Sequence, residues 1–212
     1  MRFSSALFAF AAAGLIAASP VTAAAADVLV VDFGRIYATS LAGKDAQSKL
    51  RNIGDSIEKE LQPEVEAVRT EQQKLGPRFK DKTREQVLAD LRADQALAAT
   101  YTTYAQKAQT LEQKLALRQQ ELQATEQRAL EAVVRGSEPI LQEMLKERNA
   151  DAILQANTVI IASPGADITQ EVISRLDQRL KAVAVTKVDL VAEQKAAQQR
   201  TAGQQPRPNA QR

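Results

Sequence analysis

An unbroken stripe of mostly apolar residues in the second half of the chain constrains its fold most strongly. The stripe follows alternating spacings of four and three residues, through Leu97, Tyr101, Tyr104, Ala108, Leu111, Leu115, Arg118, Leu122, Thr125 and Ala129. This is the a/d pattern of a coiled coil, with Arg118 as its one charge. No Pro or Gly lies between Gly76-Pro77 and Gly136, which leaves room for a helix of about 50 residues, roughly 75 Å long. We expect this helix to project and to pair with another helix, because it cannot bury its stripe alone.

A second apolar stripe precedes the first and supplies the partner helix. Its members recur at helical spacing: Leu50, Ile53, Ile57, Leu61, Val65, Val68 and Leu75. The stripe keeps its phase across Pro63, so we expect a kink there and not an end. Gly76-Pro77 is a strong turn signal, and Thr83 with Gln86 forms a capping box for the returning helix. The sequence predicts an antiparallel hairpin over residues 42–139, with its tip near 76–84.

Short β-branched runs on both sides of the hairpin predict a small β-rich body. Residues 27–33 are typical of a strand that ends at Gly34, and residues 35–40 have room for one helical turn. Residues 152–156 and 158–162 are typical of two further strands joined at Asn157. The body therefore comprises residues 27–41 and 140–185.

Helices complete the predicted body. Gly136 to Pro139 separates the hairpin from a short helix over residues 140–148. Asp167, with Gln170 as its box partner, is the candidate N-cap of a last helix, whose apolar face is Val172, Ile173, Leu176 and Leu180. A body this small has a marginal core, so we expect it to oligomerise. The predicted fold is mainly α (α+β), a long antiparallel helical coiled-coil hairpin inserted into a small β-sheet body.

The two ends of the chain are expected to lie outside the fold. Arg2, an apolar run from Ala6 to Ala18, and the small residues up to Ala26 predict a signal peptide over residues 1–26. Cleavage near Ala26 is the first choice, Ala23 the second, and an uncleaved anchor is the other interpretation. Residues 186–212 become rich in Gln, Ala and Pro and are expected to be disordered. The valines of residues 183–191 fit either an edge strand or an extension of the last helix.

Composition excludes several kinds of chemistry. The chain has no Cys and no His, which removes disulfides, thiolate nucleophiles, histidine acid–base catalysis and most zinc sites. Gly is scarce, and no Gly-rich phosphate-binding loop occurs, so we expect no cofactor. The acid pairs Glu58/Glu60 and Glu64/Glu66 point in different directions on a helix. An enzyme is therefore the least expected class, and no catalytic or metal-binding residues are predicted.

Basic residues at the tip are the best candidate for binding. Lys74, Arg78, Lys80, Lys82 and Arg84 stand against one acid, Asp81, a local charge of +4 over residues 74–84. Such a cluster at the end of a long arm attracts acidic ligands or an anionic lipid surface. The alternative is a solvated polar turn. The net charge of the whole chain is only +2, which argues against nucleic acid as the partner.

Three segments resemble the Skp/OmpH family of periplasmic chaperones. They are residues 105–109 with the helix that follows, residues 151–158, and residues 166–172. The N-terminal signal and the opening strand that ends at Gly34 agree with the family. The resemblance covers residues 27–181, and the order of strand, helical hairpin, strands and capped helix is more specific than any one segment.

The resemblance implies a periplasmic homotrimer in a Gram-negative cell envelope. Strands of three subunits would form a central body, from which helical arms enclose a cavity for unfolded outer-membrane β-barrel proteins without using ATP. The family also has a proposed lipopolysaccharide-binding motif, a Lys followed by two adjacent Arg. Lys107 and Arg118 match two of its positions, and Leu117 departs from the third.

Two other functions compete with this interpretation. A structural periplasmic coiled-coil spacer or adaptor would be a rod without a sheet body, and the predicted strands over residues 152–162 argue against it. A nucleic-acid-binding hairpin would need a more basic chain and no export. The holdase chaperone is therefore the leading prediction.

Overall fold

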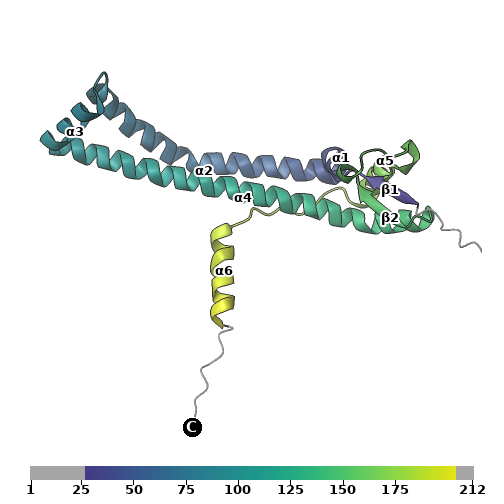
Figure 1. Cartoon of the computed structure of the whole chain (residues 1–212). Coiled ribbons are helices and arrows are strands. Elements are labelled where there is room, and N and C mark those ends of the chain that lie inside the picture. Colours follow the sequence, from purple (N-terminus) through teal and green to yellow (C-terminus); the bar gives the residue numbers. More distant parts are fainter. Residues whose placement is uncertain (1–26, 204–212) are drawn as a thin grey trace, which may run out of the picture.

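The protein consists of a small mixed body from which a long two-helix arm projects (Figure 1). The computed structural model describes residues 27–203. The predicted signal peptide, residues 1–26, lies outside the described residues, as do residues 204–212. Within the described part, no helix is both long enough and apolar enough to cross a membrane.

Two short strands join distant parts of the chain in the body. β1 (Val28–Val31) pairs in parallel with β2 (Ala152–Gln155), with Val28 opposite Ala152 and Val31 opposite Gln155. Parallel strands need a long crossover, and here the whole helical arm is that crossover. The amide of Ile168 extends the contact by donating to the Val30 carbonyl at 3.0 Å. The start and the end of the fold are therefore held together at the base of the arm.

Helices close the hydrophobic core against this sheet. α1 (Phe33–Thr39) starts at Asp32, whose side chain accepts a hydrogen bond from the amide of Arg35 at 2.9 Å. α5 (Thr169–Arg179) packs on α1 and on the end of α4. The core they share contains Leu29, Val31, Ile36, Ile140, Met144, Val172 and Leu176. The predicted helical turn after β1 is confirmed, and Gly34 lies inside it.

A single residue connects α1 to the arm. Ser40 ends α1 and caps α2 (Leu41–Phe79), since its hydroxyl accepts from the amide of Gly43 at 3.1 Å. The backbone of Gly43 lies directly against that of Tyr37, and a Cβ built at Gly43 would be 1.9 Å from the Tyr37 carbonyl oxygen. Glycine at this position allows the two helices to meet at so tight a corner.

The predicted antiparallel hairpin is confirmed, and its helices are longer than expected. α2 continues through Pro63 and through Gly76-Pro77 to Phe79. α4 (Gln95–Glu147) returns beside it and continues through Gly136 and Pro139 into the body. The expectation of separate helices before and after Gly136 is wrong. A Cβ at Gly136 would lie 2.4 Å from the Leu180 Cδ2 atom, so this glycine admits a neighbouring side chain and does not end the helix.

A third helix forms the tip. α3 (Arg84–Ala93) begins at Thr83 with the predicted capping box to Gln86. The returning helix was expected to be continuous from here, but it breaks at Asp94. The Asp94 carboxylate caps α4 by accepting from the amide of Leu97 at 2.9 Å. Asp is a favoured N-cap residue, so this acid ends α3 and starts α4.

The apolar stripe of α4 is buried unevenly. Leu97, Thr125 and Ala129 are buried, whereas Tyr101 is 40% and Leu115 47% exposed. A pair of helices covers only a narrow seam between them, and no third layer of the described residues shields Tyr101 or Leu115 from the side. The seam holds the arm together and also leaves apolar surface open along it.

Three expectations for the end of the chain are wrong. The strand predicted over 158–162 does not form; a 3-10 turn over Ala156–Thr158 (η1) follows β2, and a second turn over Pro164–Ala166 (η2) precedes α5. The N-cap of α5 is Ile168 and not Asp167. The Asp167 carboxylate accepts a hydrogen bond from the amide of Thr169 at 2.9 Å. Part of the tail expected to be disordered forms α6 (Leu190–Gly203), which points away from the arm (Figure 1).

Candidate functional site

The basic residues predicted at the tip come together at the end of the arm, but most are paired with acids. Lys74 lies 3.2 Å from Glu71, Arg78 lies 3.0 Å from Asp94, and Lys82 pairs with Asp90. Lys80 and Arg84 are exposed and have no ion-pair partner within residues 27–203. Among the five predicted tip residues, Lys80 and Arg84 are therefore the cations most available to a ligand.

The fold lowers the charge that the sequence suggested for the tip. Two of the pairing acids come from α3 and from the start of α4, which lie outside the window of residues 74–84. Residues 71–94 contain six Lys and Arg and five Asp and Glu, which leaves a net charge of +1. The tip is weakly basic overall, and its cations without an ion-pair partner in residues 27–203 are Lys80, Arg84 and Arg92.

An aromatic groove lies next to the tip and was not predicted as such. The rings of Phe79 and Tyr101 meet edge to face with centroids 6.0 Å apart, and Tyr104 lies 6.5 Å beyond Tyr101. A depression of about 160 Å³ is lined by Gln72, Leu75, Gly76, Phe79, Tyr101 and Tyr104. Both tyrosines belong to the apolar stripe, which predicts a place in the coiled-coil core, but Tyr101 presents part of its ring to solvent. A shallow aromatic groove suits weak apolar contacts.

Ion pairs between α4 and α2 occupy the residues considered for lipopolysaccharide binding. Lys107 donates to Glu71 at 2.9 Å. Lys114, which is nearer the body on α4, pairs with Glu64. The hydrogen bond from Lys107 lowers the pKa of Glu71, and that from Lys114 lowers the pKa of Glu64. Exposed pairs of this kind each stabilise a fold only slightly. They still engage Lys107 within the arm.

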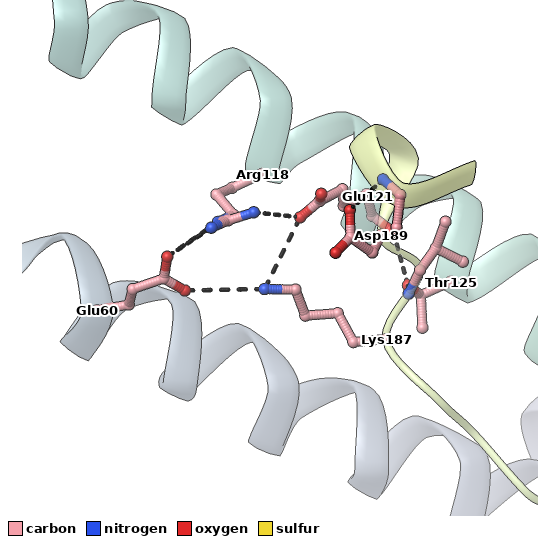
Figure 2. A network of polar contacts seen from close by, with 8 residues as sticks. Glu60, Arg118, Glu121, Thr125, Lys187 and Asp189 are labelled. Atoms are coloured by element: carbon pink, nitrogen blue, oxygen red, sulfur yellow. Dashed lines mark hydrogen bonds and ion pairs between the residues drawn. The ribbon is translucent and has the colours of Figure 1, made fainter. Parts of the chain in front are cut away.

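Arg118, the one charge in the stripe, is explained by a buried acid (Figure 2). The side chain of Glu121 is 0% exposed, and Arg118 donates to its Oε2 atom at 2.7 Å. Arg118 also donates to Glu60 on α2 at 2.6 Å. These two hydrogen bonds raise the pKa of Arg118, and the bond from Arg118 lowers the pKa of Glu60. A buried carboxylate is costly unless it is paired, so Arg118 has a structural partner on each side.

A fourth charge from the far end of the chain completes this network. The Lys187 Nζ atom lies 3.7 Å from Glu60 and 3.7 Å from Glu121. Figure 2 shows Lys187 reaching between the two acids from the segment that precedes α6. Sequence reasoning singled out Arg118 but had no signal for Lys187, because the position of Lys187 depends on the path of the C-terminal segment. Glu121 lies three residues after Arg118 on the same helix, and this spacing was a local signal that was missed.

The body has its own exposed apolar patch. Ile160 is 98% and Ile161 88% exposed, in the loop after β2. Leu154 on β2 and Val28 on β1 are also exposed, and the sheet has no third strand within the described residues. Large apolar side chains exposed this fully and side by side indicate an interaction surface.

No cluster of Asp and Glu with the grouping of a metal site occurs in residues 27–203. The candidate sites are three surfaces: the tip, the open seam of the arm and the apolar patch of the body.

Comparison with known proteins identifies the family. Residues 27–176 match the family of outer membrane proteins described as OmpH-like. The chain belongs to this OmpH-like family. The predicted resemblance is therefore confirmed, and the match includes the whole arm, both strands and most of α5.

A solved structure agrees with this assignment of the OmpH-like chain. It is that of a proposed outer membrane chaperone (OmpH-like) from Caulobacter crescentus CB15, with 28% sequence identity and a TM-score of 0.59. The similarity covers 79% of this chain and 93% of the other. No curated protein matches the sequence. Residues after 176, including Lys187 and α6, lie beyond the family match.

Proposed function

We propose that this OmpH-like protein is an ATP-independent holdase chaperone of the periplasm, which binds unfolded outer-membrane β-barrel proteins and prevents their aggregation. The observation that carries the proposal is the projecting arm with an apolar seam that is only partly covered, in a chain of this family. A holdase needs a large surface that makes many weak contacts and no catalytic group. The arm provides such a surface.

The contacts available along the arm suit variable partners. Tyr101 and Leu115 are exposed beside buried members of the same stripe, and the aromatic groove is lined by Phe79, the residue before Lys80. Adaptable surfaces with small apolar and charged contacts bind many sequences, whereas one deep pocket selects a single ligand. Unfolded β-barrel chains alternate apolar and polar residues, so they match a mixed surface.

The chaperone is proposed to act as a homotrimer, so that three arms surround one client. Two observations support an oligomer. A two-stranded sheet is marginal alone, and Ile160 with Ile161 exposes apolar surface beside it. The arms would then project from a shared body, and each could hold a different segment of the client.

The proposed function predicts suppression of aggregation without nucleotide. An outer-membrane β-barrel protein unfolded in urea is diluted into buffer that contains the mature protein and no ATP. Light scattering should stay near the level of the buffer once the trimer is in stoichiometric excess. Scattering as high as that with an equal mass of an inert soluble protein would contradict the holdase proposal and favour the structural spacer.

The tip is proposed to contribute to client capture through Lys80 and Arg84. Replacing both by Gln should slow client association at low salt and have little effect at high salt, because screening already removes exposed electrostatic attraction there. The rate is measured by stopped-flow fluorescence of a labelled client.

The matched control for the tip is Arg51→Gln with Lys59→Gln. These two cations are exposed on α2 nearer the body and have no ion-pair partner within residues 27–203, and their loss changes the net charge equally. Equal slowing by both double variants would mean that overall charge, and not the tip, attracts the client.

The arm does not favour lipopolysaccharide binding through Lys107 and Arg118, since acids of the arm already pair with both side chains.

A further inference from the structure

The chain does not leave the fold after α5 but runs back along the arm. We name residues 181–189 the strap. The strap extends beside α2 and α4 before α6 begins (Figure 1), with Val183 and Val188 buried. It lies beyond residues 27–176, the part of the chain that matches the family model.

The strap is bonded to both helices of the arm. On α2, the Asp45 carboxylate accepts from the amide of Val183 at 3.0 Å, and Lys49 donates to the Val183 carbonyl at 2.7 Å. On α4, the Thr125 hydroxyl accepts from the amide of Val188 at 3.0 Å. Backbone groups of the strap thus use side chains of both helices as partners, which fixes its register on the arm.

Lys187 fastens the strap next to its most buried residue, Val188. It lies between Glu60 of α2 and Glu121 of α4, at 3.7 Å from each. Together with Arg118 it forms a network of two acids and two bases, one member of which, Glu121, has no exposed surface. Removing one partner of a buried pair leaves an uncompensated charge and is costly. Lys187 is therefore expected to matter more than an ordinary surface lysine.

The far end of the strap is held on α4 as well. Arg128 makes a two-pronged contact with Glu193 in the first turn of α6, with bonds of 2.7 and 2.9 Å. The Asp189 carboxylate accepts from the amide of Ala192 at 2.8 Å and so starts α6. The helix begins only after the strap has been secured to the arm.

The side chains between α2 and α4 are buried to different extents on the two sides of the point where the strap ends. In the proximal part, Ile57 and Leu61 of α2 and Thr125 and Ala129 of α4 are all buried. Beyond the Glu60–Arg118 pair, Val65, Tyr101 and Leu115 are exposed, and buried side chains return only near the tip, as Leu75 and Leu97, where α3 packs on α4. The stretch between that pair and the tip is therefore packed less closely than the part that carries the strap.

We propose that the strap is a latch that locks α2 to α4 in the proximal arm, residues 45–61 and 118–133, and that the arm flexes beyond the Glu60–Arg118 pair. Between that pair and the tip, α2 and α4 contact each other without a third segment of the described residues 27–203, and can part and close around a ligand. This division into a stiff base and a flexible end does not depend on which ligand the arm binds.

Hydrogen exchange followed by mass spectrometry tests the latch in the full mature protein. In the unaltered protein, proximal peptides should exchange more slowly than distal ones, residues 64–75 and 104–115. Lys187→Met should speed exchange of the strap and of the proximal peptides about tenfold or more, because it removes one of the two cations that face the buried Glu121 carboxylate. Distal peptides should change little. Lys195→Met, an exposed lysine of α6, is the matched control and should change none of them.

Two outcomes would overturn the latch. Faster exchange of the strap alone, with the proximal helices unchanged, would make it a passive appendage. Equal acceleration in the body, the proximal arm and the distal arm would mean that Lys187 supports the whole fold. Thr125→Val provides a second variant if Lys187→Met fails to fold. It removes the acceptor of the Val188 amide, and should loosen the same peptides.

Discussion

Replacing Gly43 by alanine is expected to destabilise the protein by about 3 kcal/mol, at the upper end of the range for overpacking a folded interior. The added Cβ would lie 1.9 Å from the Tyr37 carbonyl oxygen and 2.6 Å from its carbon. Both are backbone atoms of α1, so no side chain can turn away to make room. The corner between α1 and α2 must open instead, and the Ser40 cap with it.

Gly54→Ala is the matched control for this prediction. Gly54 lies in the same helix, and a Cβ there would meet no atom within 4 Å. Alanine in a helix interior is favoured over glycine by about 1 kcal/mol, so this variant should be slightly more stable than the parent. Urea unfolding followed by circular dichroism measures both. An unchanged or raised midpoint for Gly43→Ala would show that the corner is looser than the structure indicates.

Replacing both Ile160 and Ile161 by aspartate is expected to convert the proposed trimer into single chains. Each isoleucine is almost fully exposed in the isolated subunit, and burying such a side chain contributes roughly 1.5–3 kcal/mol. Losing two such side chains per subunit removes roughly 3–6 kcal/mol of association free energy, which weakens assembly about a hundredfold or more. The introduced charges would also repel their copies in the other subunits. The mass by light scattering at micromolar concentration should fall from three chains to one.

The subunit itself should keep its fold in this variant, because neither side chain packs inside it. Its helical circular dichroism should match that of the parent. Leu88→Asp with Val191→Asp replaces exposed apolar residues of α3 and α6 and should leave the mass unchanged. A trimer that survives the isoleucine substitutions would place the interface elsewhere, and a parent protein of monomeric mass would refute the trimer.

Periodicity predicted the arm correctly because it is a local property of each helix. The stripe before Leu75 and the stripe after Leu97 form the two helices expected, and the capping box at Thr83 is present. Gly136 and Pro139 were misleading because their local tendency to end a helix is overridden by the burial of their helical neighbours Val133, Ser137 and Ile140 in the body. The run from Thr158 to Ala162 has strand-forming residues, but no strand lies beside it within residues 27–203 for it to pair with.

The candidate sites were harder to predict because their charges pair across long separations. Arg78 meets Asp94, 16 residues away, and Arg118 meets Glu60, 58 residues away. A count of charges in a short window cannot include such partners, so the tip looked more basic than it is. The position of Arg118 in the stripe was visible as an anomaly, but its explanation required the fold, which places Glu60 of α2 beside it and buries Glu121.

The continuity of α4 gives the molecule a mechanical property. One unbroken helix is embedded in the body through Ile140 and Met144 and reaches the tip at Gln95. At 1.5 Å per residue it is about 80 Å long, so a tilt of about 5° where it leaves the core displaces its far end by several ångströms. Small rearrangements among the packed side chains of the body are thereby amplified, and the buried end of α4 acts as the pivot that sets the reach of the arm.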